Sequence, residues 1–412
     1  MDFSNLTCCV IESGIFQSLA HRLARDFGKV YYYRHTERVH PVTSDREPGM
    51  GYDDIELIEH WSDMLGEVDL WVCPDIHDGH LQELLVKMGQ RVFGSRRAEE
   101  LEIKRSDFRK IMSDISLEVP PYMEVTGLDD LRETLKEVED KYIKTDANIR
   151  GTSETWHHRN YKLSQAHLDK LSSRFGALRE SQKWLIDDPI PDVSEIGYDG
   201  ICVDGQFPKS ALIGVESKDR AYVGQFMPLN LMPKIVRKIN DKLSPLLEDY
   251  GYRGFFSTEI RGQYLLEPTC RAPTPAGECE QEIYSNLSDM IWGASEGHVI
   301  DPVPAANYCA QVMIVSHEMD DASPLPIDIP EEVRQWVKLY NSAKGQDGLE
   351  WVAPTPTRMS EIGSIVGIGN SPEKAFKELE KHSEGHETWA MRLEIDLESV
   401  ESARKDLEKG LR

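Results

Sequence analysis

A chain of 412 residues is long for one domain and ordinary for two or three. Its 47 lysines and arginines against 72 aspartates and glutamates give a formal charge of -25, which disfavours nonspecific binding to nucleic acid and to anionic membranes. Any anionic ligand must therefore be met by a few specifically placed cations.

The cysteines are scattered and form no Cys-x-x-Cys pair. They are Cys8, Cys9, Cys73, Cys202, Cys270, Cys279 and Cys309. Such a set indicates reduced thiols and predicts a cytoplasmic location. The polar residues after Met1, and the lack of an apolar run of membrane-spanning length, predict a protein that is neither exported nor embedded in a membrane.

The first hundred residues alternate between strand-like and helix-like patterns. The predicted strands cover 7–11 (TCCVI), 30–33, 68–72 and 92–93, with helices after Gly14 and over 81–88. This alternation predicts a parallel sheet with helices on its faces. We therefore expect an α/β N-terminal domain over residues 1–98.

The middle of the chain mixes further helices and strands. Helical patterns cover 98–112, 128–138, 229–246 and 283–294, and strands are predicted at 122–125, 141–145, 184–186, 200–203, 255–260 and 264–267. Residues 146–160 (DANIRGTSETWHHRN) are polar and lack periodicity, so they predict an exposed loop. The tail from Asp301 mixes short strands with a charged helix near 373–380.

The most informative segment is RGFFSTEIRGQYLLEPTCRAPTP, residues 253–275. Glu259 and Glu267 stand on the two strands of its predicted hairpin, where paired strands can bring both carboxylates to one face. Two such oxygen ligands suit Mg²⁺, which is usually completed by waters and substrate phosphates. Arg271, four residues after Glu267, can present a guanidinium to a phosphorylated intermediate. The alternative is that these glutamates are solvated charges at strand ends.

Three upstream positions could hold phosphates. Lys104 stands on a predicted helix, and Lys144 stands on the strand before the polar loop. Within that loop, residues 151–153 (Gly151, Thr152 and Ser153) could offer backbone N–H groups and hydroxyls. Each position taken alone also fits an ordinary solvated side chain or turn.

Adjacent histidines in the same loop raise the alternative of a metal site. His157 and His158 follow Trp156, but neighbouring residues of an extended segment point in opposite directions. We therefore expect exposed polar residues there rather than zinc ligands.

The order of these features resembles phosphoribosylamine-glycine ligase, a family of the ATP-grasp superfamily. The resemblance runs over most of residues 66–300 and, more faintly, the tail, where GSIVGIGNSPEKAFKELEK resembles the family's last domain. It begins with VDLWVCPDIHDGHLQELLVKMGQRVFGSRRAEELEIKRSDFRKIMSDISLEVPPYMEV. It continues in IKT, EIGYDGICVDGQ, ESKDR and YRGFFSTEIRGQYLLEPTCRAP.

The resemblance implies an ATP-grasp domain of two α+β lobes over residues 99–300, followed by a small α+β domain over 301–412. It implies ATP and Mg²⁺, or Mn²⁺ in its place, with small-molecule carboxylate and amine substrates. The residues it assigns to ATP are Lys104, Lys144, Gly151, Thr152, Ser153, Asp187 and Asp188. Those it assigns to metal are Glu259, Glu267 and Thr269, and those it assigns to catalysis are Arg271, Arg220 and Lys218.

Three departures from the family pattern bear on the substrates. Thr269 stands where the metal motif has asparagine, which leaves one or two metal ions open. The first turn reads ESGIFQS rather than a glycine-rich phosphoribosylamine-binding run, and AYVGQFMPLNLMP replaces a second glycine-rich segment. We therefore expect a carboxylate-amine ligase with altered substrates. A true phosphoribosylamine-glycine ligase and an inactive ATP-binding sensor stay as alternatives, and the oligomeric state stays open.

Overall fold

The structure is a computed structural model that describes residues 1–34, 46–146, 155–190, 194–218, 220–316, 324–353 and 361–409. The chain divides into two compact units. Unit 1 comprises Met1–Glu99, Ser194–Glu259 and Thr269–Arg412, and unit 2 comprises Glu100–Val193 and Ile260–Pro268. Each unit has a hydrophobic core of its own.

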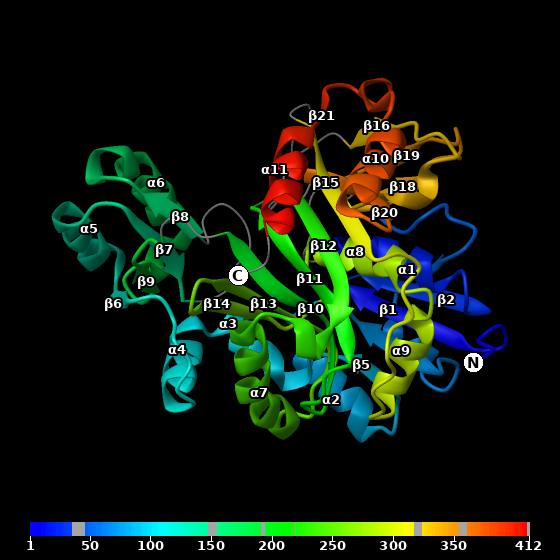
Figure 1. The fold of residues 1–412 in the computed structure, drawn as a ribbon, viewed down its shortest axis with the longest axis horizontal. Coiled ribbons are helices and arrows are strands. Elements are labelled where there is room, and N and C mark those ends of the chain that lie inside the picture. Colours follow the sequence, from blue (N-terminus) through cyan, green and yellow to red (C-terminus); the bar gives the residue numbers. More distant parts are fainter. Residues whose placement is uncertain are drawn as a thin grey trace. The chain divides into compact units, whose positions relative to one another are not determined.

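Unit 1 begins with the parallel sheet that the alternating patterns predict (Figure 1). Its elements are β1 (Thr7–Glu12), α1 (Gln17–Leu23), β2 (Lys29–Arg34), β3 (Glu56–Leu57), β4 (Leu70–Cys73), α2 (Gly79–Lys87) and β5 (Val92–Gly94). β1 and β4 are apolar and buried on both faces, as parallel strands covered by helices must be. The prediction of a parallel N-terminal sheet is confirmed.

The same sheet continues into antiparallel strands in the order β17-β20-β15-β12-β11-β10-β13-β5-β4-β1-β2-β3. The added strands are β10 (Glu195–Val203), β11 (Ser210–Ser217), β12 (Ala221–Pro228), β13 (Arg253–Arg261), β15 (Tyr308–Ser316), β17 (Val337–Leu339) and β20 (Glu361–Gly369). β21 (Leu393–Ile395) also pairs with β15. β11 and β12 are not among the strands that the sequence patterns predict.

Several helices cover this sheet, and three short strands form a separate sheet. The helices are α7 (Lys234–Asp249), α8 (Ala276–Ile283), α9 (Leu287–Ser295), α10 (Pro372–His382) and α11 (Leu397–Glu408). The short strands are β16 (Leu325–Ile327), β18 (Ser342–Lys344) and β19 (Glu350–Val352). The helix expected over 283–294 is α9, and α8, which ends at Ile283, precedes it.

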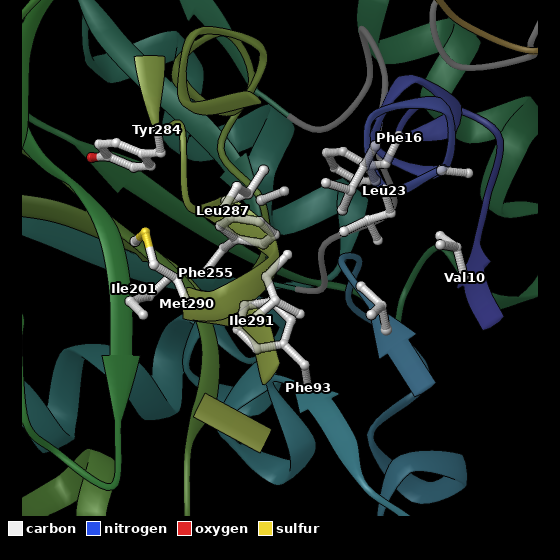
Figure 2. Close-up of a cluster of buried hydrophobic side chains, with 14 of the residues drawn as sticks. Val10, Phe16, Leu23, Phe93, Ile201, Phe255, Tyr284, Leu287, Met290 and Ile291 are labelled. Atoms are coloured by element: carbon white, nitrogen blue, oxygen red, sulfur yellow. The ribbon is translucent and has the colours of Figure 1, made fainter. Parts of the chain in front are cut away.

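The core of unit 1 joins distant parts of the chain. Phe16 just before α1, Leu23 of α1, Phe93 of β5, and Leu287 and Ile291 of α9 belong to one buried cluster (Figure 2). The same cluster includes Ile201 on β10 and Phe255 on β13. Because the cluster includes both N-terminal and middle segments, the strands that carry the pocket described below are anchored to the same core as the parallel sheet.

Unit 2 is built around the four-stranded sheet β6-β9-β7-β8. Its elements are α3 (Glu100–Ile103), α4 (Arg105–Asp114), β6 (Tyr122–Thr126), α5 (Leu128–Glu137), β7 (Lys141–Thr145), β8 (Thr155–His158), α6 (Tyr161–Phe175), β9 (Lys183–Asp187) and β14 (Tyr264–Thr269), of which β14 ends one residue beyond the unit. α5 and α6 bury Leu128, Leu131, Leu135, Leu168 and Leu171 against Ile143, Trp184 and Ile186 of the sheet.

One prediction fails in unit 2. The end of the expected loop, Thr155–His158, is strand β8, which pairs with β7. His158 is fully buried rather than exposed, with its ring nitrogens 2.7 Å from Ser164 Oγ and 3.0 Å from the carbonyl oxygen of Val138. These two partners make it a structural histidine.

The expectations about the cysteines and about membrane-spanning segments can be compared with the structure. All seven cysteines are buried and free, as reduced core thiols. In the part of the chain that the structure describes, the helices are too short or too polar to cross a membrane.

Candidate active site

One pocket of unit 1 gathers three of the residues predicted to act on substrate or metal. Glu259 on β13, Thr269 at the end of β14, and Arg271 beyond it all line this pocket. Its cavity volume is about 40 Å³. A water needs roughly 10–15 Å³ of such space, so the pocket admits a few waters, an ion or a small polar group.

The register of the antiparallel strands explains why polar side chains meet at this pocket. Glu195 on β10 lies opposite Glu216 on β11, and Glu216 lies opposite Tyr222 on β12. Residues directly opposite each other point to the same face of a sheet. Glu195, Glu216 and Tyr222 therefore form one row, and all three line the pocket.

Glycines in the next row make room for the tyrosine ring. Gly214 lies opposite Gly197 on one side and Gly224 on the other. A Cβ atom at Gly214 would lie 2.2 Å from the ring of Tyr222, and one at Gly224 would lie 2.7 Å from it. The ring can lie over this part of the sheet only because both positions lack a side chain.

Three carboxylates that line the pocket lie around one lysine. Glu195, Glu216 and Glu259 each offer an oxygen, and these oxygens lie within 4.8 Å of one another. The Nζ atom of Lys218 lies 3.1 Å from Glu259 Oε1 and 3.9 Å from a carboxylate oxygen of each of the other two. The predicted metal ligand Glu259 is thus accompanied by two glutamates that the sequence analysis did not select.

The donor set of this cluster fits a hard divalent cation. All three donors are carboxylate oxygens, the ligands that Mg²⁺ and Mn²⁺ take. Two oxygens bound to one Mg²⁺ at about 2.1 Å are at most about 4.2 Å apart. The three carboxylates would therefore have to move inward to bind one ion together.

Asp199 forms a buried acidic position in the wall of the same pocket. It accepts hydrogen bonds from the Tyr222 hydroxyl at 2.6 Å and from Ser257 Oγ at 2.7 Å. Burial raises the pKa of Asp199 to about 6, against the opposing effect of these two hydrogen bonds. Asp199 therefore titrates close to neutral pH.

The three residues predicted to act in catalysis have different surroundings. Lys218 lies among the carboxylates described above. Arg271 lines the pocket, and its Nη1 donates to the carbonyl oxygen of Ala272 at 3.3 Å. Arg220 is exposed and lies 2.6 Å from Asp396, at the start of α11. The structure therefore brings Lys218 and Arg271 to the residues of the pocket and leaves Arg220 paired with the C-terminal segment.

Lys144 has a buried polar environment in unit 2. Its side chain is 13% exposed, and its Nζ lies 3.6 Å from Glu267 Oε2 and 3.9 Å from Asp187 Oδ2. Two arginines of α4 join this group. Arg105 Nε lies 3.6 Å from Glu267, and Arg109 Nη2 donates to Asp187 at 2.7 Å. Lys144 and Glu267, which the resemblance assigns to ATP and metal, are thus neighbours.

The other predicted ATP ligands have other ion-pair partners or lie outside the described residues. Asp188 is paired with Lys141 at 2.5 Å. Lys104, between α3 and α4, is half-exposed, with its Nζ 3.1 Å from Glu100. Gly151, Thr152 and Ser153 lie outside the described residues.

Sequence reasoning missed the pocket residues on β10, β11 and β12. The signal that could have found them is the pattern Glu-x-Gly-x-Asp at 195–199 followed by Gly-x-Glu at 214–216. In both, acidic residues and glycines alternate with apolar residues, as on a strand with one polar face.

Comparisons with known proteins bear on the fold. No model of a known protein family matches the chain. A curated relative, the carbamoyl phosphate synthase large chain of Corynebacterium glutamicum, is 20% identical over 313 residues, which are 73% of this chain and 27% of that protein. The chain therefore spans about a quarter of the length of that relative.

Solved structures match the chain over most of its length. Phosphoribosylamine-glycine ligase from Thermotoga maritima matches with a TM-score of 0.67 at 17% identity, covering 92% of this chain and 96% of that one. The biotin carboxylase domain of the 2-oxoglutarate carboxylase of Hydrogenobacter thermophilus, solved with MgADP and bicarbonate, matches with a TM-score of 0.67 at 12% identity, covering 98% and 94%.

A third structure, N5-carboxyaminoimidazole ribonucleotide synthetase from Thermotoga maritima, matches with a TM-score of 0.58 at 12% identity, covering 95% of this chain and 100% of that one. All three solved relatives are ATP-grasp ligases. The chain therefore has the fold of the ATP-grasp ligases, as its sequence predicts.

Proposed function

We propose that the chain is an ATP-dependent ligase that joins a carboxylate to an amine through an acyl phosphate. The observation that carries this proposal is the pocket shared by Glu259, Thr269 and Arg271, with the Nζ atom of Lys218 3.1 Å from Glu259 Oε1. One metal ligand, one metal-motif hydroxyl and two cations are thus together in unit 1. The ATP-grasp fold supports the same reaction class.

On this proposal, lysine side chains hold the phosphates of the nucleotide. Lys144 is shielded from solvent and already lies beside acidic groups, so its charge would act on a triphosphate in a low-dielectric setting. Lys104 and residues 151–153 would add further contacts. Glu259, with Glu195 and Glu216 beside it, would hold Mg²⁺, which would neutralise the charge that develops on the transferred phosphoryl group.

The reaction then needs two displacements. An oxygen of the substrate carboxylate forms a bond to the γ-phosphorus of ATP, and the bond to ADP breaks. The neutral amine forms a bond to the acyl carbon, inorganic phosphate leaves, and the amine nitrogen gives up a proton. Arg271 lines the pocket and would stabilise the oxyanion of the second displacement, with Lys218 and Arg220 as the other predicted cations.

The proposal includes the layout and setting expected from the sequence. On this proposal the chain has an N-terminal domain over residues 1–98, an ATP-grasp domain of two lobes over 99–300 and a C-terminal domain over 301–412. ATP and Mg²⁺ are its cofactors, with Mn²⁺ as a substitute. The substrates of the chain are small molecules. We expect no nonspecific binding to nucleic acid and no membrane partner, and a cytoplasmic location.

ADP release tests the proposal. The intact chain is incubated with Mg²⁺ and ATP, and with pools of carboxylic acids and amines that include glycine with phosphoribosylamine. We expect ADP release only when an acid and an amine are both present. Glu259→Gln should abolish it, whereas Glu248→Gln, at an exposed position on α7, should not.

The alternatives give other results in the same assay. Turnover with phosphoribosylamine and glycine alone would identify the family's own reaction. ATP binding by calorimetry, with no ADP release from any pool, would favour the inactive sensor. The hydroxyl of Thr269 in place of a carboxamide ligand is the feature that keeps this second alternative open.

A further inference from the structure

Asp199 is one of the carboxylates that line the pocket, with Glu195, Glu216 and Glu259. Its position follows from the two-residue period of a strand, because residues 195, 197 and 199 of β10 point to one face of the sheet. All three line the cavity, which is large enough for a few waters, and a primary amino group is about the size of one water. An amino group in this cavity therefore has Asp199 in its wall.

The surroundings of Asp199 differ from those of the other three carboxylates. Those three lie around Lys218, at 3.1–3.9 Å from its Nζ atom, and a positive charge so close makes a carboxylate a weaker base. Asp199 instead accepts hydrogen bonds from the neutral hydroxyls of Tyr222 and Ser257. Among the described residues, no lysine or arginine pairs with Asp199. Asp199 is therefore the carboxylate of the pocket that is best placed to accept a proton.

The titratable groups that interact with Asp199 are all acids. They are Glu195 on β10, Tyr222 on β12, Cys279 and Glu280 on α8, and Tyr284 directly after α8. Burial raises the pKa values of the last four well above their usual ranges, so these four are uncharged near neutral pH. On the strands beside β10, Leu212 lies opposite Asp199 and Ser257 is bonded to it, and neither titrates. Arg271 lines the same cavity.

The spacing along β13 suits a base beside the reacting carbonyl group. Ser257, which donates to Asp199, precedes Glu259 by two residues, about 6.6 Å along a strand. A base lies about 2.6–3.2 Å from the atom that loses the proton, and an attacking atom approaches its target to about 3–3.5 Å. These two steps together span about 6–7 Å. An amine therefore fits between Asp199 and an acyl phosphate held near Glu259.

We propose that Asp199 is the base that removes a proton from the amine substrate, which enters the pocket as a primary ammonium group. An N–H bond of the ammonium breaks, its proton moves to a carboxylate oxygen of Asp199, and the electron pair left on nitrogen forms the bond to the acyl carbon. The bond from that carbon to the phosphate oxygen breaks, and the departing phosphate takes the second proton from nitrogen. Asp199 gives its proton to water before the next turnover. This inference rests on the proposed ligase function and adds a catalytic residue to it.

Hydroxylamine separates the proposed step from the chemistry of ATP. It is a neutral nucleophile at pH 7, so it needs no base before it attacks, and it converts an acyl phosphate into a hydroxamate. The full chain is assayed with Mg²⁺, ATP and the acid that supports ADP release, once with the amine and once with hydroxylamine. In Asp199→Asn, the ratio of the amide rate to the hydroxamate rate should fall about a hundredfold or more, the usual effect of losing a general base.

The pH profile of amide formation gives a second measurement. Burial raises the pKa of Asp199 to about 6, so kcat/KM of the unchanged chain should fall below about pH 6, and this fall should be absent in Asp199→Asn. Tyr222→Phe removes a hydrogen bond that lowers the pKa of Asp199, so it should move the fall to higher pH. This variant reports on the base if Asp199→Asn does not fold. Asp249→Asn, at the exposed end of α7, is the matched control and should change neither the ratio nor the profile.

The outcomes separate the base from the ligase. An unchanged ratio of amide to hydroxamate in Asp199→Asn, or a fall at acid pH that persists in that variant, would overturn the role of Asp199 and leave the ligase standing. An equal loss of both products would also overturn it, because Asp199 would then act on the fold or on ATP. If neither product forms from any acid, the ligase itself is contradicted, and the base with it.

Discussion

Tyr222 contacts Asp199 through its hydroxyl and is paired with Glu216 in the sheet. Its hydroxyl donates a 2.6 Å hydrogen bond to Asp199, while its backbone lies opposite Glu216, one of the three carboxylates around Lys218. Both relationships depend on the register of β11 and β12 and on the glycines that leave space for the ring. The hydroxyl of Tyr222 therefore links Asp199 to the row of the sheet that carries Glu195 and Glu216.

The raised pKa of Asp199 predicts a change of stability with pH. Its folded pKa is about 6, above the usual value of about 3.9 for an unfolded chain, so the native state holds a proton that the unfolded state has lost. Its contribution to the free energy of unfolding should therefore fall by about 3 kcal/mol as pH rises from 4 to 6 and then stay level. Asp199→Asn should remove this loss.

Chemical denaturation of both proteins at several pH values measures the effect. The free energy of unfolding of Asp199→Asn, relative to the unchanged chain, should increase between pH 4 and pH 6.5. A constant difference over that range would show that Asp199 has an ordinary pKa in the folded chain.

Space beside Tyr222 is the basis of a second prediction. Gly214→Ala places a Cβ atom 2.2 Å from the tyrosine ring, which must then move. Overpacking of this kind costs about 1–3 kcal/mol of stability and should displace the hydroxyl from Asp199. Gly277→Ala, whose nearest contact would be an ordinary 3.6 Å, is the control and should be well tolerated. Thermal unfolding of both variants compares them, and equal Tm values would contradict this account of the pocket.

Two lysines of β7 should differ in their effect on ATP. Lys144→Met removes a shielded charge beside Glu267 and Asp187, and should weaken ATP binding about tenfold or more. Lys141→Met removes a lysine that is paired with the half-exposed Asp188, and should change the affinity less than about twofold. Calorimetry with MgATP gives both affinities. The reverse order would place the phosphates elsewhere in unit 2.

The threonine in the metal motif predicts a gain of function. Thr269→Asn supplies a carboxamide oxygen in place of a hydroxyl at a position that lines the pocket. The concentration of Mg²⁺ that gives half-maximal ADP release should fall, with Thr269→Val as the variant that has no oxygen ligand and should raise it. No change in either variant would show that residue 269 does not reach the metal.

Elements dominated by local pattern could be predicted from the sequence. The buried strands TCCVI and LWVC, the helix after Ser371 and the hairpin of Glu259 and Glu267 all have apolar periodicity with clear ends. The antiparallel strands β11 and β12 were harder, because Gly214 and Gly224 interrupt their apolar runs and read as turn signals.

The candidate site could be predicted only in part, for a physical reason. Glu259, Arg271 and Lys144 follow from motif order, which the resemblance supplies. Glu195 and Glu216 approach Glu259 only through the pairing of strands that are distant in sequence, and register is not a local property. Asp199 is buried in the pocket wall with no cationic partner among the described residues, a setting that appears only once the strands are packed together.

Transfer of labelled oxygen is the most direct test of the acyl phosphate. With the acid and amine that support ADP release, the substrate carboxylate is labelled with ¹⁸O, and the inorganic phosphate formed is analysed by mass spectrometry. The proposed reaction moves one carboxylate oxygen to phosphorus, so each phosphate formed should carry one ¹⁸O atom. Phosphate without ¹⁸O, formed while the amide accumulates, would contradict activation of the carboxylate by phosphoryl transfer.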